Sequence, residues 1–289
     1  MASSSSTAAI VKAPPGELPV TTIRSTSGWL PPRLGELWHE RQLLYFLAWR
    51  DVKVRYAQTV LGAVWTIFQP LALMLVFTLA FRRIGKVETE GVNYAVFCLA
   101  GLTFWMFFSR AVTQGSDSLV ANAQLVTKTS CPRLLIPLAS ITGALVDFAV
   151  GLAFFFVFAA IYGYWPSWRI IFLVPSLVLG LTFLVGIVLL LAPLNVRYRD
   201  VRQALPFLVQ IWLFLSPVAY PITSLGPRWS AIVALNPLVG VIESFRWSLL
   251  GTPPPTAVQL ASAIVIGLLA FGVGLTTFAR AERTIADLA

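Results

Sequence analysis

The sequence has little charge, few cysteines and one histidine, and each scarcity excludes a class of protein. Its 289 residues include 21 Lys and Arg and 12 Asp and Glu, or 11% charged, against about 25% in soluble domains. So few charges could not cover the surface of a soluble globule, and the mean hydropathy of +0.80 agrees. The only cysteines, Cys98 and Cys131, exclude a disulfide-rich scaffold, and the lone His39 argues against a zinc or histidine-based catalytic centre. The composition therefore predicts an integral membrane protein.

The sequence also lacks the motifs that carry common enzymatic chemistry. It contains no G-x-x-x-x-G-K-[ST] loop, because its one Gly-Lys pair, Gly85-Lys86, is followed by Val87. Neither H-E-x-x-H nor G-x-S-x-G occurs. We therefore predict no catalytic residue, metal site or cofactor on this chain, and any ATP-driven work requires a partner.

Six apolar runs are long enough to cross the hydrocarbon core of a bilayer. They predict spanning helices near 60–81, 91–109, 138–162, 170–194, 204–223 and 257–279. Fifteen of the 21 Lys and Arg residues then fall on one side, including Arg110, Lys128 and Arg133 between the second and third spans. The positive-inside rule places this side and both termini in the cytoplasm, although Arg82 and Arg83 lie opposite. We therefore expect the basic residues behind the net charge of +9 to contact anionic lipid on this side, and not to bind nucleic acid.

The N-terminal region divides into two parts ahead of a transmembrane domain at 58–289. Residues 1–34 are rich in Ser, Thr, Ala and Pro, which predicts a disordered cytoplasmic arm. Residues 35–57 mix charges with aromatics, which predicts an amphipathic helix at the cytoplasmic membrane interface. An aromatic stripe along this helix consists of Trp38, Tyr45, Trp49 and Tyr56. A second, apolar stripe on its other side consists of Leu43, Leu44, Leu47 and Val54. The aromatic stripe could contact lipid or pack against a spanning helix, and the sequence leaves both open.

The segment between the fifth and sixth spans is too apolar for a solvent loop. Residues 237–250 form a helix-like run with Asn236 before it and Gly251 after it, and 14 residues cannot span a bilayer. Pro217 and Pro221 break the preceding span near its outer end. We predict re-entrant outer helices, which must be buried in protein or line a water-filled cavity. This is the first feature of the sequence that indicates a substrate pathway.

Few acids lie in the predicted membrane region. Asp147 is the one clear acid within a span, which argues against ion coupling. It either lines a pathway or pairs with a cation of a neighbouring helix, and we favour the second reading. Glu243 and Arg246 are three residues apart, which favours a local ion pair. The alternative is that they contact a polar substrate at an outer exit together with Asn236 and Pro237.

Aromatic residues recur in the predicted spans. Each ring alone is more often core or lipid-facing, but aromatic faces also stack on sugar rings. As a set they indicate a carbohydrate route, made of Trp65, Phe68, Trp105, Phe108, Trp212, Phe214 and Tyr220.

Several segments occur in the order found in one family. They are 49–70, 101–108, 118–137, 195–201 with 216–221, and 236–251. On them the chain resembles the membrane subunits of ABC-2-type exporters, most closely the permeases of O-antigen, teichoic acid and related polysaccharides. Cys131 departs from the family pattern, which commonly has Phe before the proline at 132.

The resemblance implies an all-α integral membrane protein of the bacterial inner membrane, with six transmembrane helices, a cytoplasmic interface helix and re-entrant outer helices. It implies a homodimer around a channel, bound to two ATPase subunits that hold ATP and Mg²⁺. Residues 119–128 would be the helix that contacts the ATPase. The coupling residues would be Leu119, Asn122, Leu125, Lys128, Pro132, Trp49, Arg50, Asp51 and Arg55. The cargo would be a glycan on a polyprenyl diphosphate lipid, attracted by Arg50, Lys53 and Arg55.

Other functions stay open at this point. Within the family, the cargo could be a drug or a small lipid. From other classes, the chain could be an ion-coupled lipid-glycan flippase or a membrane-embedded glycosyltransferase. The single intramembrane acid argues against the flippase, and the scattered acids argue against the aspartate-rich site of a glycosyltransferase.

Overall fold

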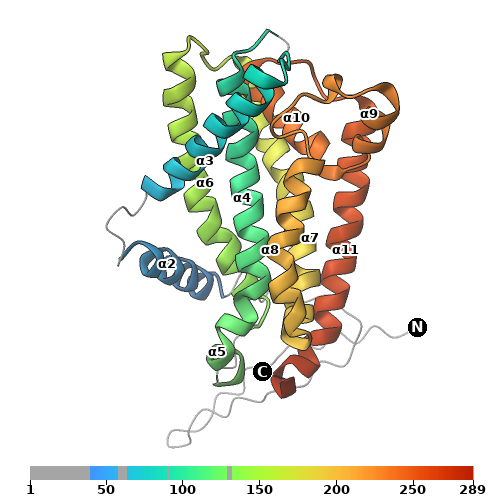
Figure 1. Ribbon diagram of the computed structural model, residues 1–289. Coiled ribbons are helices and arrows are strands. Elements are labelled where there is room, and N and C mark those ends of the chain that lie inside the picture. Colours follow the sequence, from blue (N-terminus) through green and yellow to red (C-terminus); the bar gives the residue numbers. More distant parts are fainter. Residues whose placement is uncertain (1–39, 58–63, 90, 129–131, 289) are drawn as a thin grey trace, which may run out of the picture.

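A computed structural model describes residues 40–57, 64–89, 91–128 and 132–288, and this part of the chain is built of helices and their connections. Most helices stand side by side in one bundle, and the short helix α5 and the pair α9 and α10 lie at opposite ends (Figure 1). We name these ends the α5 end and the α10 end. The elements are α2 Arg41–Ala57, α3 Val64–Phe77, η1 Thr78–Ile84, α4 Tyr94–Ala121, α5 Ala123–Lys128, α6 Leu135–Ile161, η2 Trp168–Phe172, α7 Leu173–Arg197, α8 Arg199–Leu215, η3 Ile222–Ser224, α9 Pro227–Val233, α10 Pro237–Leu250 and α11 Ala257–Leu288.

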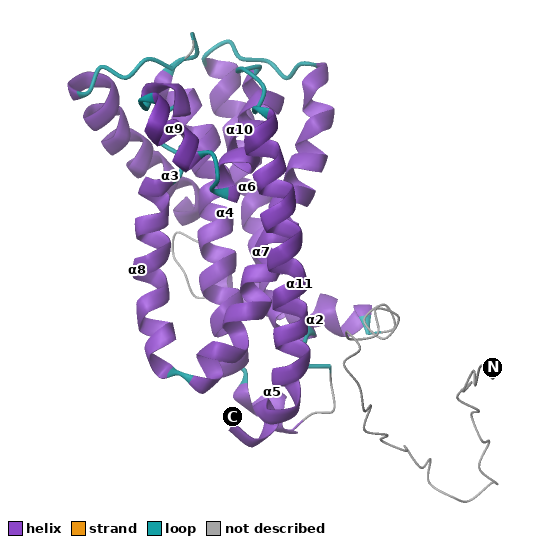
Figure 2. Cartoon of the chain, turned by 90° about the vertical axis from the view of Figure 1, so that its right-hand side faces the viewer, coloured by secondary structure: helices purple, strands orange, loops and turns teal. Residues whose placement is uncertain are grey.

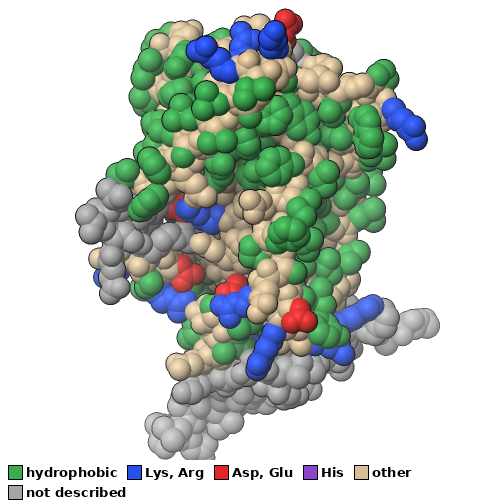
Figure 3. Space-filling view, viewed as in Figure 1, with side chains coloured by type: hydrophobic (Ala, Val, Ile, Leu, Met, Phe, Trp, Pro, Cys, Tyr) green, Lys and Arg blue, Asp and Glu red, His purple; other side chains and the backbone are tan. Residues whose placement is uncertain are grey.

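Five helical stretches of the described chain are long and apolar enough to cross a membrane. They are Val64–Ile84, Tyr94–Ala121, Leu135–Ile161, Trp168–Arg197 and Ala257–Glu282. Apolar side chains cover the middle of the molecule, and charged ones gather towards its two ends (Figure 3). The predicted all-α membrane fold is thereby confirmed, with five spans matching the predicted first four and sixth.

The second span is longer than predicted. α4 continues to Ala121 instead of ending near residue 109, so Arg110 lies inside the helix and not in a loop. The helix continues because it is the central element of the bundle: Ala111, Val112 and Gly115 beyond the apolar run are buried in protein. Packing therefore extends a helix whose sequence alone predicts an end.

The fifth span differs from the prediction at both ends. α8 begins at Arg199 and ends at Leu215, so its 17 residues cover about 25 Å, less than a bilayer core. It ends two residues before Pro217, because the residue before a proline avoids the helical conformation. The described chain has a sixth membrane-crossing unit only if the bent pair α9 and α10 is counted as one.

α9 and α10 form a bent pair, which is the geometry of a re-entrant loop or of a broken span. α9 and α10 meet at 97°, and α10 has the predicted bounds. The Asn236 side chain accepts a hydrogen bond from the Leu238 amide, which caps the start of α10. Gly251 ends the helix with φ of 71°, a left-handed conformation that glycine adopts without strain.

Glycines bring α7 and α11 close together. A Cβ on Gly186 would overlap the backbone at Ala270 and Phe271, and one on Gly274 would overlap the backbone of Gly186. Such small-residue contacts replace the hydrophobic driving force that lipid does not provide between spanning helices. The pair thus forms a tightly fixed part of the bundle.

α2 is a helix, as predicted, and it lies beside the bundle, near its α5 end (Figure 1). Leu47 and Ala48 are buried against the first turns of α6. Tyr45 and Trp49 are 64% and 57% exposed, and their rings stack 6.5 Å apart. The leucine side therefore packs on protein, and the described aromatics do not pack against a spanning helix. Trp38, the side chain of Tyr56 and the predicted arm at 1–34 lie outside the described residues.

Candidate functional site

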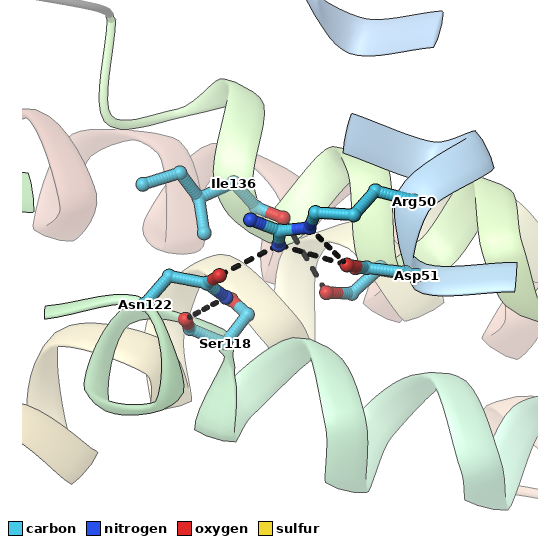
Figure 4. A network of polar contacts seen from close by, with 6 residues as sticks. Arg50, Asp51, Ser118, Asn122 and Ile136 are labelled. Carbon is cyan, nitrogen blue, oxygen red and sulfur yellow. Dashed lines mark hydrogen bonds and ion pairs between the residues drawn. The ribbon is translucent and has the colours of Figure 1, made fainter. Parts of the chain in front are cut away.

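Several helices meet at the last turns of α4, at residues 116–122, which we name the α4 junction. Asn122 ends α4, and its side-chain oxygen accepts a hydrogen bond of 2.6 Å from Nη2 of Arg50 on α2. Its amide nitrogen donates to the Ser118 carbonyl at 2.9 Å, so both ends of the amide are used (Figure 4). The same Nη2 of Arg50 lies 2.8 Å from Oδ1 of Asp51. These contacts attach α2 to the end of α4.

α5 follows the α4 junction directly and is held by apolar contacts. Leu119, fully buried, and Val126 belong to one cluster with Phe278 of α11. Leu125 packs against this cluster and also against the one formed by α2 and α6. Movement of α5 would therefore act on α2, α4, α6 and α11 together.

α7 and α8 also reach the α4 junction. Asn195 of α7 is buried and donates from Nδ2 to the Ser116 carbonyl at 3.0 Å. Arg202 of α8 donates from Nη2 to Oδ2 of Asp117 at 3.0 Å, and its Nε lies 2.9 Å from Oδ1. Sequence reasoning did not single out these four residues for a role. The usable signal was the segment 195–201, in which a polar Asn follows an apolar span and precedes several arginines.

The predicted coupling residues are only partly brought together. Leu119, Asn122, Leu125, Arg50 and Asp51 lie around the α4 junction. The predicted coupling helix at 119–128 begins later, at residue 123, because Asn122 leaves helical geometry with φ of −113° and ψ of 33°. The remaining members are Trp49, which is exposed, Pro132, which is half-buried, and Arg55 and Lys128, whose side chains lie outside the described part. Their role in coupling stays a prediction.

At the α10 end, the chain between α8 and η3 is held by side chains from the bundle. Arg246 is completely buried and donates to the carbonyls of Pro217 at 2.6 Å and Val218 at 2.5 Å. The Tyr94 hydroxyl donates to the next carbonyl, that of Ala219, at 2.6 Å. Gly101 leaves space for this arrangement, since a Cβ there would lie 2.9 Å from the Val218 oxygen. Non-helical backbone at membrane depth is thus supplied with donors by the protein.

The Glu243 and Arg246 side chains form the predicted local ion pair. Nη1 of Arg246 lies 3.3 Å from Oε1 of Glu243, and the guanidinium carbon lies 3.7 Å from the centre of the Phe97 ring. Glu243 is only 7% exposed, so this conformation does not present the pair to a substrate. Asn236 is likewise engaged in structure, because it caps α10 and accepts a hydrogen bond from Nε1 of Trp212 at 3.3 Å.

Asp147 is paired in the same way. Its Oδ2 lies 2.7 Å from Nη1 of Arg110 on α4, and the acid is 4% exposed. The favoured reading, a structural acid that pairs with a cation of a neighbouring helix, is confirmed. Its partner, Arg110, lies within α4, whereas the sequence predicts a loop there.

The predicted aromatic set is divided between core and surface. Trp105 and Phe108 are buried in the bundle, and Trp212 packs edge-on against Phe108 at 5.4 Å. Trp65 and Phe68 are 52% and 54% exposed on α3, where they line a hollow of about 490 Å³.

The remaining members of the aromatic set lie nearer the α10 end. Phe214 is exposed on α8 and contacts Phe77 of α3 at 6.4 Å between ring centres. Tyr220 follows α8, and the centre of its ring lies 6.2 Å from the centre of the Phe81 ring. The structure therefore leaves only part of the set free to contact a cargo.

Comparison with known proteins gives one consistent result. The family model described as ABC-2 type transporter matches residues 42–250. The O-antigen export system permease protein RfbA of Myxococcus xanthus is 31% identical over 213 residues, which are 73% of this chain and 81% of that protein. A protein of the same name from Klebsiella pneumoniae is 27% identical over 85% of this chain and 94% of its own length. The polysialic acid transport protein KpsM of Escherichia coli is 22% identical over 82% of this chain and 92% of its own.

Proposed function

Because the chain belongs to the ABC-2 type transporter family, we propose that it is the permease subunit of an ATP-driven exporter that moves a polysaccharide across the inner membrane. The observation that carries this proposal is the similarity to polysaccharide permeases over most of both chains. The lack of a P-loop in the sequence supports an ATPase on a separate subunit.

We propose that two copies of the chain pair and that two ATPase subunits bind at the α5 end, which faces the cytoplasm with both termini. The α4 junction supports this assignment, since α5 projects from it and α2 is bonded to it. Closure of the ATPase pair on ATP would displace α5 and α2 as rigid bodies. The exposed aromatic side of α2, with Tyr45 and Trp49, is available for the ATPase or for lipid headgroups.

The cargo path is proposed to follow the exposed faces of α3 and α8. Trp65 and Phe68 on α3 and Phe214 on α8 are exposed aromatics at membrane depth, and Gln69 and Gln210 are exposed polar groups on the same two helices. In a dimer these faces would enclose sugars between stacking surfaces and amide hydrogen-bonding groups.

The glycan is proposed to travel on a polyprenyl diphosphate lipid. Cationic side chains at the α5 end would attract the diphosphate. Of the three predicted contacts, Arg50 is already engaged by Asp51 and Asn122, whereas Lys53 is exposed. The side chain of Arg55 lies outside the described residues. Lys53 is therefore the described residue best placed for this contact.

Deletion of the gene from its host tests the proposal. The expected result is accumulation of polyprenyl-linked glycan in the cytoplasm and its loss from the cell surface, both reversed by the intact gene. If no such glycan accumulates, the polysaccharide assignment is wrong. Complementation with Arg50→Glu and Arg55→Glu together tests the coupling role, with Arg83→Glu at the α10 end as the matched charge reversal. Unchanged export and unchanged assembly with the ATPase in the first variant would contradict the docking role of α2.

A further inference from the structure

α8 is lightly held along its length. Only Leu205, Val209 and Leu213 of its 17 residues are buried, and the helix stands at one edge of the bundle (Figure 2). Much of the rest of its apolar surface is exposed, including Phe207, Leu208, Ile211, Phe214 and Leu215. A helix with one narrow packed stripe can slide or tilt against its neighbours without breaking a core.

The first turn of α8 carries an ion pair to α4. Two nitrogens of Arg202 face both carboxylate oxygens of Asp117, at 2.9 and 3.0 Å. The Nη2–Oδ2 contact is a hydrogen bond strengthened by the charges of both groups, and the Nε–Oδ1 contact adds attraction without the geometry of a hydrogen bond. The pair therefore constrains how the foot of α8 sits on α4, which the apolar stripe alone does not.

Asp117 lies in the α4 junction, between the attachments of α2 and α7. Arg50 bonds to Asn122, one and a half turns after Asp117, and Asn195 bonds to the carbonyl of Ser116 immediately before it. α5 begins at residue 123. Any displacement of α5 that moves the end of α4 thus reaches Asp117 before it reaches the packed stripe of α8.

We propose that Asp117 and Arg202 are positioning residues that transmit movement of α5 to α8. The inference rests on the proposed function, because it assumes that an ATPase moves α5. The pair does not touch the cargo; it sets the angle of the helix whose exposed face lines the proposed path.

The exposure of the pair separates this role from a purely structural one. The Arg202 and Asp117 side chains are 57% and 27% exposed, and exposed ion pairs contribute little to folding stability. Coupling between sites, in contrast, needs only a small differential free energy to change an equilibrium about fivefold. We therefore expect variants that fold and assemble normally but transmit movement poorly.

Charge reversal and charge exchange test the link in the reconstituted complex of permease and ATPase. Asp117→Arg and Arg202→Asp are each expected to lower polysaccharide exported per ATP hydrolysed at least about fivefold. The double variant, which restores an opposite pair, is expected to recover most of the loss. Arg199→Asp is the matched control, because Arg199 is exposed on the same turn and no described carboxylate forms an ion pair with it. The proposal would be overturned if both single variants exported as much polysaccharide per ATP as the unaltered complex, or if the double variant recovered none of the loss.

A distance measurement reads the same link without the cargo. Spin labels at Gln210→Cys on α8 and Val157→Cys on α6, with Cys98 and Cys131 replaced by alanine, should change separation when a non-hydrolysed ATP analogue is added. Each single reversal should abolish this change and the charge exchange should restore it. An unaltered change in the single variants refutes the link. A label change that depends on the pair, when the unlabelled complex with Gln210 intact exports no polysaccharide, would instead contradict the proposed function and leave the link standing.

Discussion

Replacement of Arg246 with Met is expected to destabilise the permease strongly, because the guanidinium is fully buried and satisfies several groups at once. It donates to two backbone carbonyls, at Pro217 and Val218, and lies 3.3 Å from the carboxylate of Glu243. Met fills a similar volume but offers no donor, so two carbonyls at membrane depth lose this partner and a buried carboxylate loses its counter-charge. Removing one member of a buried ion pair typically costs about 3–5 kcal/mol.

The assay is thermal unfolding of the purified permease in one detergent, followed by loss of the monodisperse species. At about 2–4 °C per kcal/mol, the expected fall in apparent Tm is about 6–20 °C. A double variant, Arg246→Met with Glu243→Gln, removes the stranded charge and is expected to regain part of the loss. Arg246→Lys keeps the charge but not the forked guanidinium that reaches both carbonyls. Its apparent Tm should therefore lie between those of the intact protein and of Arg246→Met. A fall below about 2 °C for Arg246→Met would refute the reasoning, because the buried contacts would then contribute little.

Three further predictions follow from the packing. Gly101→Ala should lower the apparent Tm, because the new Cβ would meet Arg246 and a backbone carbonyl, whereas Gly272→Ala, which has open space, should leave it unchanged; equal effects would contradict the proposed contact. Asp147→Ala should cost about 3 kcal/mol, and adding Arg110→Met should recover part of this loss, as measured in the same assay. Trp49→Ala should change stability by less than about 0.5 kcal/mol, because the exposed ring supports no core, yet it should lower export. Unchanged export would show that the aromatic side of α2 has no part in the mechanism.

Local signals were sufficient wherever an element is determined by its own sequence. α10 was predicted with its bounds because Asn236, Pro237 and Gly251 act through local backbone chemistry. Asp147 was assigned to an ion pair because an isolated charge in a membrane requires a partner, although the partner itself was misplaced in a loop. Membrane class and most spans followed from the length of the apolar runs.

The remaining features depend on contacts between distant segments. α4 extends past its apolar run because neighbouring helices bury it, and no periodicity in the sequence reports that. Trp105 and Trp65 have similar sequence contexts, yet one is buried in the bundle and the other is exposed on α3. Asp117 and Arg202 are 85 residues apart, so both charges are visible in the sequence but the contact between them is not.

We propose that this chain conducts a polysaccharide with energy from a separate ATPase. The most direct test of this proposal is transport by the purified permease and ATPase in proteoliposomes loaded on the ATPase side with polyprenyl diphosphate-linked glycan. The glycan is expected to become accessible to a glycosidase on the opposite side only when ATP is hydrolysed and only when the permease is present. Glycan that stays inaccessible while the complex hydrolyses ATP, or that crosses without ATP, would contradict the proposal.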